Sequence, residues 1–112
     1  MLLEEDAIRL HHMLDAAQEA VEYARGRNRD DLDSDRQLEH SLVRCVEIIG
    51  EAASHVSDEC RVANLGIRWR GIIGMRNRLI HAYFDVNLNI LWRSVTEELP
   101  PLLDELKRIL EI

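Results

Sequence analysis

The spacing of apolar residues is the feature that most constrains the fold of this 112-residue chain. In two long stretches they recur at alternating intervals of four and three positions, which places them on one face of an α-helix. The first stretch comprises Leu3, Ala7, Leu10, Leu14, Ala17, Val21 and Ala24. The second comprises Leu38, Leu42, Cys45, Ile49, Ala52 and Val56. Strand-type alternation appears nowhere over a useful length, so the sequence predicts an all-α protein.

Turn-forming and capping residues predict the ends of the first two helices. Gly26 and the polar residues that follow it end the first helix. The second is expected to begin near Ser34, with Asp33 or Ser34 as its N-cap. Residues 57–66 are interpreted as a connection, because the helical period fails there.

The second half of the chain predicts two further helices and a short terminal one. The third covers about residues 68–81, and Asp85 or Asn87 can cap the fourth. Pro100 and Pro101 interrupt the fourth helix, because proline lacks an N–H and clashes with the preceding turn. Pro101 suits the first turn of the short fifth helix. The architecture we expect is a bundle of four main helices plus this C-terminal one.

The composition favours a single globular domain over residues 1–112. With 46% hydrophobic and 31% charged residues, the chain does not resemble a disordered one. No apolar run approaches the roughly 18 residues that cross a bilayer, and acids stand where a secretory signal would carry positive charge. Cys45 and Cys60 form no CxxC pair. We therefore expect a cytoplasmic protein with reduced thiols, no membrane association, no metal site and no cofactor.

Four apolar residues lie off the main stripes, namely Leu2, Ile48, Ile90 and Trp92. Some of them must be covered by a second chain or by a connecting loop. A chain this short also buries only about two thirds of its unfolded surface when it folds alone. We therefore expect a homodimer.

The net charge of −7 at first speaks against a nucleic-acid partner, but the charge is segregated. Residues 1–60 hold 15 acids and 6 arginines, a balance of −9. Residues 61–93 hold six arginines and one acid, a balance of +5, and residues 94–112 carry −3. Arginine is suited to bidentate phosphate contact. The alternative interpretation is that these arginines form solvated salt bridges with the acids of residues 1–60.

The basic segment contains a possible reactive group. Arg76 falls on the apolar stripe of the third helix, where a guanidinium is costly unless it faces a partner, a cleft or a ligand. Asn77 and His81 are four apart, so on a helix Asn77 could orient the imidazole. Arg76 and His81 are separated by about 140° on an ideal helix. To act together, they need a distorted or ended helix, a long reach by Arg76, or two chains.

Arginine and histidine without nearby carboxylates suit the cleavage of RNA. His81 could act as general base on the 2′-hydroxyl or as acid to the leaving oxygen. Arg76 could stabilise charge on the transition state, and no metal is required because the nucleophile is internal to the RNA. Taken alone, the short string Arg-x4-His favours the alternative interpretation, a capped surface histidine without catalytic function.

The surrounding sequence adds a family resemblance. Residues 69–83, WRGIIGMRNRLIHAY, resemble the hallmark stretch of the HEPN superfamily, specifically the HepT-like toxins. The motif of these toxins is Arg, a polar residue, His and, two positions on, Tyr, which here fall on Arg76, Asn77, His81 and Tyr83. The segments VEIIGEAASHVS and VNLNILWRSVTEELPPLL are also similar to that family, so the likeness spans most of the chain.

The resemblance implies a helical homodimer whose cleft joins two copies of the motif. It also implies a metal-independent endoribonuclease, with Arg76 and His81 catalytic, that is the toxin of a toxin–antitoxin pair. The cognate antitoxin would be a nucleotidyltransferase that adds AMP to Tyr83. The alternative is a non-catalytic scaffold for such a partner. Further arginines are expected to bind RNA, namely Arg68, Arg70, Arg78 and Arg93.

Other chemistry-bearing residues give weaker signals. His11 and His12 point about 100° apart on a helix, so they are poor co-ligands. Glu51 and His55 share a helical face, but no second pair exists to build a di-metal site. Trp69 and Trp92 flank the basic segment and could stack on bases, although packing is the more common role. Cys45 is expected in the core.

Overall fold

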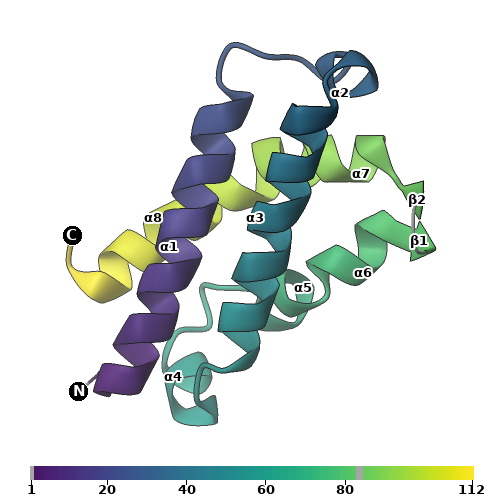
Figure 1. Ribbon diagram of the computed structural model, residues 1–112. Helices are drawn as coiled ribbons and strands as arrows, with labels where there is room; N and C mark the ends of the chain where they lie inside the picture. Colours follow the sequence, from purple (N-terminus) through teal and green to yellow (C-terminus); the bar gives the residue numbers. More distant parts are fainter. Residues whose placement is uncertain (1, 83–84) are drawn as a thin grey trace.

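Two long antiparallel helices form the centre of the molecule (Figure 1). The computed structural model describes residues 2–82 and 85–112, with the backbone only of His81 and Ala82. Helix α1 (Glu4–Ala24) and helix α3 (Arg36–Ser54) pack together along the predicted stripes. Leu10, Leu42 and Ile49 are fully buried between them and their neighbours. The predicted all-α class is confirmed.

The chain between these helices contains a short helix, α2 (Asp31–Ser34). Gly26 has a φ of 73°, the left-handed conformation that glycine adopts without strain, and α1 ends just before it. The predicted N-cap of the second long helix is wrong by one or two positions. Asp35 caps α3, and its carboxylate accepts the Leu38 N–H at 3.0 Å. Asp33 and Ser34 cannot cap α3, because they form α2.

The segment interpreted as a connection holds a further helix, α4 (Asp58–Ala63). Ser57 caps it, since its Oγ accepts the Cys60 N–H at 3.2 Å. The carboxylate of Asp6 on α1 accepts the Ser57 N–H at 2.9 Å and the Ser57 hydroxyl at 2.7 Å. Asp6 is only 4% exposed. This buried cluster holds the start of α4 against the first turns of α1. Because it joins residues 51 positions apart, the local spacing of apolar residues could not predict it.

The helix predicted over residues 68–81 is wrong at two points. It is broken at Gly74 (φ −85°, ψ 0°) into α5 (Trp69–Ile73) and α6 (Met75–Leu79). After Leu79 the chain becomes extended, and β1 (Ile80–Ala82) pairs antiparallel with β2 (Asp85–Val86). The Leu79 carbonyl accepts the Asn87 N–H at 2.6 Å, which closes this hairpin in place of another helical turn. Such short strands leave no alternation to detect.

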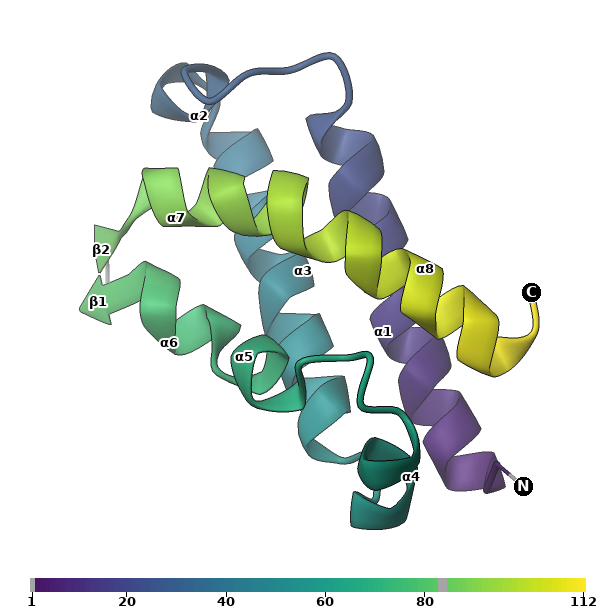
Figure 2. The same cartoon turned by 180° about the vertical axis from the view of Figure 1, so that it is seen from behind.

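The last 25 residues form one long arm that packs across α1 and lies in front of it in Figure 2. It consists of α7 (Leu88–Arg93), a π-helical turn η1 (Ser94–Glu98) and α8 (Leu99–Leu110). Asn87 caps α7 as expected, because its side chain accepts the Ile90 N–H. The prolines occupy the first turn of α8, as predicted for Pro101, but they do not end the arm. The π turn accommodates them, with the Leu99 N–H bonded to the Ser94 carbonyl.

The four off-stripe residues Leu2, Ile48, Ile90 and Trp92 are half-buried against the core. Each therefore still offers apolar surface, and the expected homodimer stays a prediction. Within residues 2–82 and 85–112, no helix is long and apolar enough to cross a bilayer.

Candidate functional site

Arg76 lies on the surface of α6, at the edge of a hollow in the protein. Its neighbours Met75 and Leu79 are fully buried, so α6 is anchored by its apolar side. The Arg76 side chain is 49% exposed, and its Nε donates to Glu47 Oε2 of α3 at 3.0 Å. A guanidinium on the apolar stripe was expected to face a partner, a cleft or a ligand. The Arg76 guanidinium lines this open hollow.

The hollow beside Arg76 has a volume of about 490 Å³ and is bounded by α1, α3 and α6. Its charged and polar lining residues are Arg9, His12, Arg44, Glu47, Glu51 and Arg76, and Ile48 and Ala52 supply apolar lining. Sequence reasoning missed Arg9 and Arg44, which lie in the acidic segment 1–60, and it considered His12 only as a poor metal co-ligand. The one signal available was the three-residue spacing of Arg9 and His12, which places both on one face of α1.

The end of α6 at Leu79 bears directly on the Arg-x4-His spacing. Arg76 lies in α6 and His81 lies in β1, so the 140° separation on an ideal helix does not apply. Three arrangements were expected to let the two residues act together. The structure shows the first, in which the helix ends between them. The predicted stacking of Asn77 and His81 on one helix face is wrong for the same reason. Asn77 is exposed on α6, and Tyr83 lies outside the described residues.

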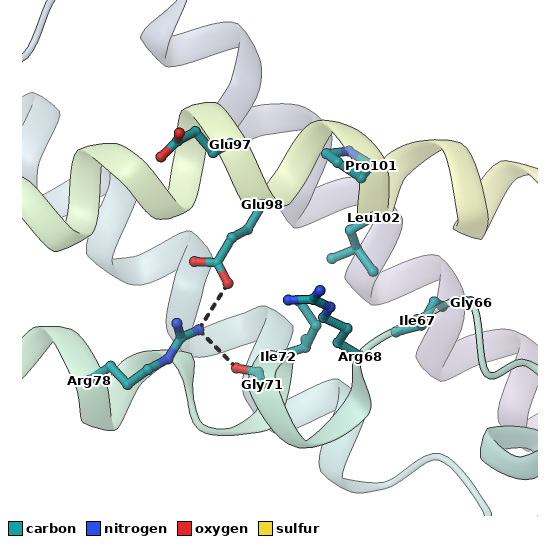
Figure 3. A pocket seen from close by; sticks show the side chains of 10 residues that line it. All are labelled: Gly66, Ile67, Arg68, Gly71, Ile72, Arg78, Glu97, Glu98, Pro101 and Leu102. Atoms are coloured by element: carbon teal, nitrogen blue, oxygen red, sulfur yellow. Dashed lines mark hydrogen bonds and ion pairs between the residues drawn. The ribbon is translucent and has the colours of Figure 1, made fainter.

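Arg68 and Arg78 line a different cavity of about 380 Å³, between α5, α6 and the C-terminal arm (Figure 3). Arg78 Nη2 donates to Glu98 Oε1 at 3.1 Å and to the Gly71 carbonyl at 3.0 Å. The Arg68 guanidinium points into the cavity, toward the C-terminal arm. Arg76 and Arg78 are about 200° apart on α6, so they serve two different faces. The structure therefore does not gather the predicted RNA-binding arginines around Arg76.

The remaining candidate arginines are exposed. Arg70 lies on α5, and Arg93 on α7 approaches Glu97 at 3.5 Å. The salt-bridge interpretation of the basic segment is confirmed in part, since Arg76, Arg78 and Arg93 all have carboxylate partners. Only the partner of Arg76 comes from residues 1–60.

The tryptophans and the cysteine have structural positions. Trp69 is 8% exposed, and its Nε1 donates to the Asn64 carbonyl at 3.0 Å, so it is not an accessible stacking platform. Trp92 is half-buried. Cys45 is buried in the core as predicted, and burial raises the pKa of its thiol to about 11.

The weaker histidine candidates lie on the surface. His11 and His12 are exposed, and His55 Nε2 lies 3.6 Å from Glu51 Oε1 on one exposed face of α3 and its end. In the described part of the chain, no three His, Cys, Asp or Glu side chains cluster as metal ligands would.

Comparison with known proteins identifies relatives over most of the chain. The family model described as "Ribonuclease HepT-like" matches residues 13–109. A protein of Caldanaerobacter subterraneus subsp. tengcongensis, named "Putative RNase TTE0752", is 37% identical over 102 residues, which cover 91% of each chain. "Probable ribonuclease HepT" of Thermococcus cleftensis is 34% identical over 80 residues, which cover 71% of this chain and 73% of the relative. No solved structure matches the chain significantly.

Proposed function

The chain belongs to the ribonuclease HepT-like family, and we propose that it is a metal-independent endoribonuclease, the toxin of a toxin–antitoxin pair. The observation that carries this proposal is the position of Arg76. A half-exposed guanidinium, held by Glu47 at the rim of an open hollow, stands five residues before His81 with the end of α6 between them. The family model covers this stretch, and relatives that match most of the chain are named as ribonucleases.

The chemistry we assign to this pair is transesterification within the RNA strand. His81 accepts the proton of a 2′-hydroxyl, whose oxygen then forms a bond to the adjacent phosphorus. The bond from phosphorus to the 5′-oxygen breaks, that oxygen takes up a proton from water, and His81 returns its proton to the solvent. Arg76 binds the phosphate oxygens, which carry more charge in the transition state than in the substrate. The products are a 2′,3′-cyclic phosphate and a 5′-hydroxyl.

The proposal includes dimerisation and control by a partner. A homodimer would bring two copies of the Arg76–His81 segment into one cleft. The partner is a nucleotidyltransferase antitoxin that transfers AMP from ATP to the Tyr83 hydroxyl and releases pyrophosphate. The added phosphate carries negative charge and bulk, so it would repel or block an RNA phosphate near Arg76.

Two assays test this proposal. Purified protein is incubated with RNA in excess EDTA, and the new 3′ ends are analysed; we expect cleavage that leaves cyclic phosphates. The partner and ATP should add AMP mass to the wild type but not to Tyr83→Phe. A stable complex with the partner, without RNA cleavage or growth arrest, would support the scaffold alternative instead.

A further inference from the structure

We propose that Arg9 and Arg44 bind RNA phosphates next to the cleaved bond, so that the acidic half of the chain supplies part of the substrate-binding surface. This inference rests on the proposed function and deepens it. Both residues line the 490 Å³ hollow that Arg76 also lines, Arg9 from α1 and Arg44 from α3. They therefore lie beside the residue assigned to the reacting phosphate, although 32 positions or more separate them from it in sequence.

The ion pairs of the hollow leave these two arginines available. Glu47, the carboxylate nearest to Arg76, is already paired with it at 3.0 Å. Glu51 lies 3.6 Å from His55 and is 77% exposed. Within the described residues, neither Arg9 nor Arg44 has a carboxylate within 4.0 Å, in contrast to Arg78 and Arg93. Three arginines and two carboxylates line the hollow, and Arg9 and Arg44 have no carboxylate partner in the described part of the chain, so the hollow favours an anion.

The geometry of the hollow favours a chain of phosphates over a single small anion. The cationic groups come from three helices and line an open depression, to whose lining Ile48 and Ala52 also contribute. A single-stranded RNA presents repeated phosphates and apolar base faces, so it can contact arginines and an aliphatic side chain together. Each guanidinium can bind a phosphate in bidentate fashion.

The test measures binding of a fluorescent single-stranded oligoribonucleotide whose 2′-O-methyl groups prevent cleavage, at several salt concentrations. Each phosphate contact on a single strand contributes about 0.7 to the slope of log affinity against log salt. We expect Arg9→Ala and Arg44→Ala each to weaken binding severalfold and to reduce that slope by about 0.7. Arg36→Ala is the matched control, because Arg36 is an exposed arginine of α3 that does not line the hollow.

The outcomes separate this inference from the function on which it rests. Wild-type cleavage together with unchanged affinity and slope in both variants overturns the inference alone. The same holds if the variants change only the monomer–dimer equilibrium, which sedimentation measures, because the hollow would then bind a second copy of the chain. A wild type that neither binds nor cleaves RNA overturns both. Circular dichroism verifies that the variants fold.

Discussion

The Nε–H of Arg76 donates to Glu47 Oε2 at 3.0 Å, and this bond joins α6 to the middle of α3. A guanidinium has donors on two edges, and the bond to Glu47 uses Nε alone. The two terminal nitrogens make no hydrogen bond to other described residues, so they remain available for two oxygens of one phosphate. Glu47 thereby acts as a positioning residue for Arg76.

Replacing Glu47 should therefore impair RNA cleavage without unfolding the protein. Because both partners are partly exposed, the ion pair contributes at most about 1 kcal/mol to stability. We expect Glu47→Ala to lower the single-turnover cleavage rate about tenfold, since a displaced guanidinium binds the transition state less well. Glu47→Gln should stay closer to the wild type, because its amide oxygen can accept the same hydrogen bond. Wild-type cleavage by Glu47→Ala would contradict the positioning role. Glu39→Ala, a carboxylate change on α3 outside the hollow, is the control.

The buried contact between Asp6 and Ser57 makes a prediction about stability. Asp6→Ala removes an acceptor of two hydrogen bonds and leaves the Ser57 N–H and hydroxyl without that partner. The expected loss is about 3 kcal/mol in the free energy of unfolding, measured by urea denaturation. Asp15→Ala, an exposed change on the same helix, should cost far less. Equal losses in the two variants would show that the contact has no special role.

The N-cap of α3 makes a prediction about acid. The Arg27 guanidinium at 2.8 Å, and then the Leu38 N–H, hold the pKa of Asp35 below its ordinary value. A lowered pKa in the folded state stabilises the protein above the unfolded pKa and ceases to do so as the pH falls through the folded one. Asp35→Ala should therefore have a lower Tm than the wild type at neutral pH. That difference should shrink when the pH falls below the ordinary pKa of 3.8. A difference that is constant with pH, or that grows in acid, would refute this assignment.

Both thiols should be unreactive in the folded protein. Burial raises the pKa of Cys45 to about 11 and also raises that of Cys60, which disfavours the nucleophilic thiolate. Titration with a disulfide reagent at neutral pH should detect little free thiol in native buffer and both thiols in denaturant. Fast reaction of Cys45 in native buffer would mean that the core between α1 and α3 opens readily.

The long helices could be predicted because each has a continuous apolar face. The stripes through Leu10 and Leu42 pack as the four-and-three spacing indicates, and the Asn87 cap is visible because its hydrogen bond is local. The break at Gly74 and the hairpin after Leu79 could not be read in this way. Residues 68–81 keep a helical apolar pattern across both points, and the Leu79 carbonyl bonds to Asn87, a residue beyond that stretch.

The candidate site was predictable only in part, because it too depends on contacts between residues distant in sequence. Arg76 was identified because a guanidinium on an apolar stripe is anomalous. Arg9 and Arg44 are ordinary polar-face residues of their own helices, and only the packing of α1 and α3 against α6 brings them to Arg76. The charge count, in contrast, predicted too much. The arginines of the basic segment do not form one surface, because Arg76 and Arg78 line two different hollows.

The central claim is most directly tested by single-turnover cleavage of an RNA substrate in excess EDTA, comparing the wild type with His81→Ala. We expect a loss of roughly a hundredfold or more, as removal of a general acid–base group produces. His11→Ala, which removes an exposed histidine of α1, should cleave at the wild-type rate. Cleavage by His81→Ala at the wild-type rate, or no cleavage by the wild type, would contradict the account.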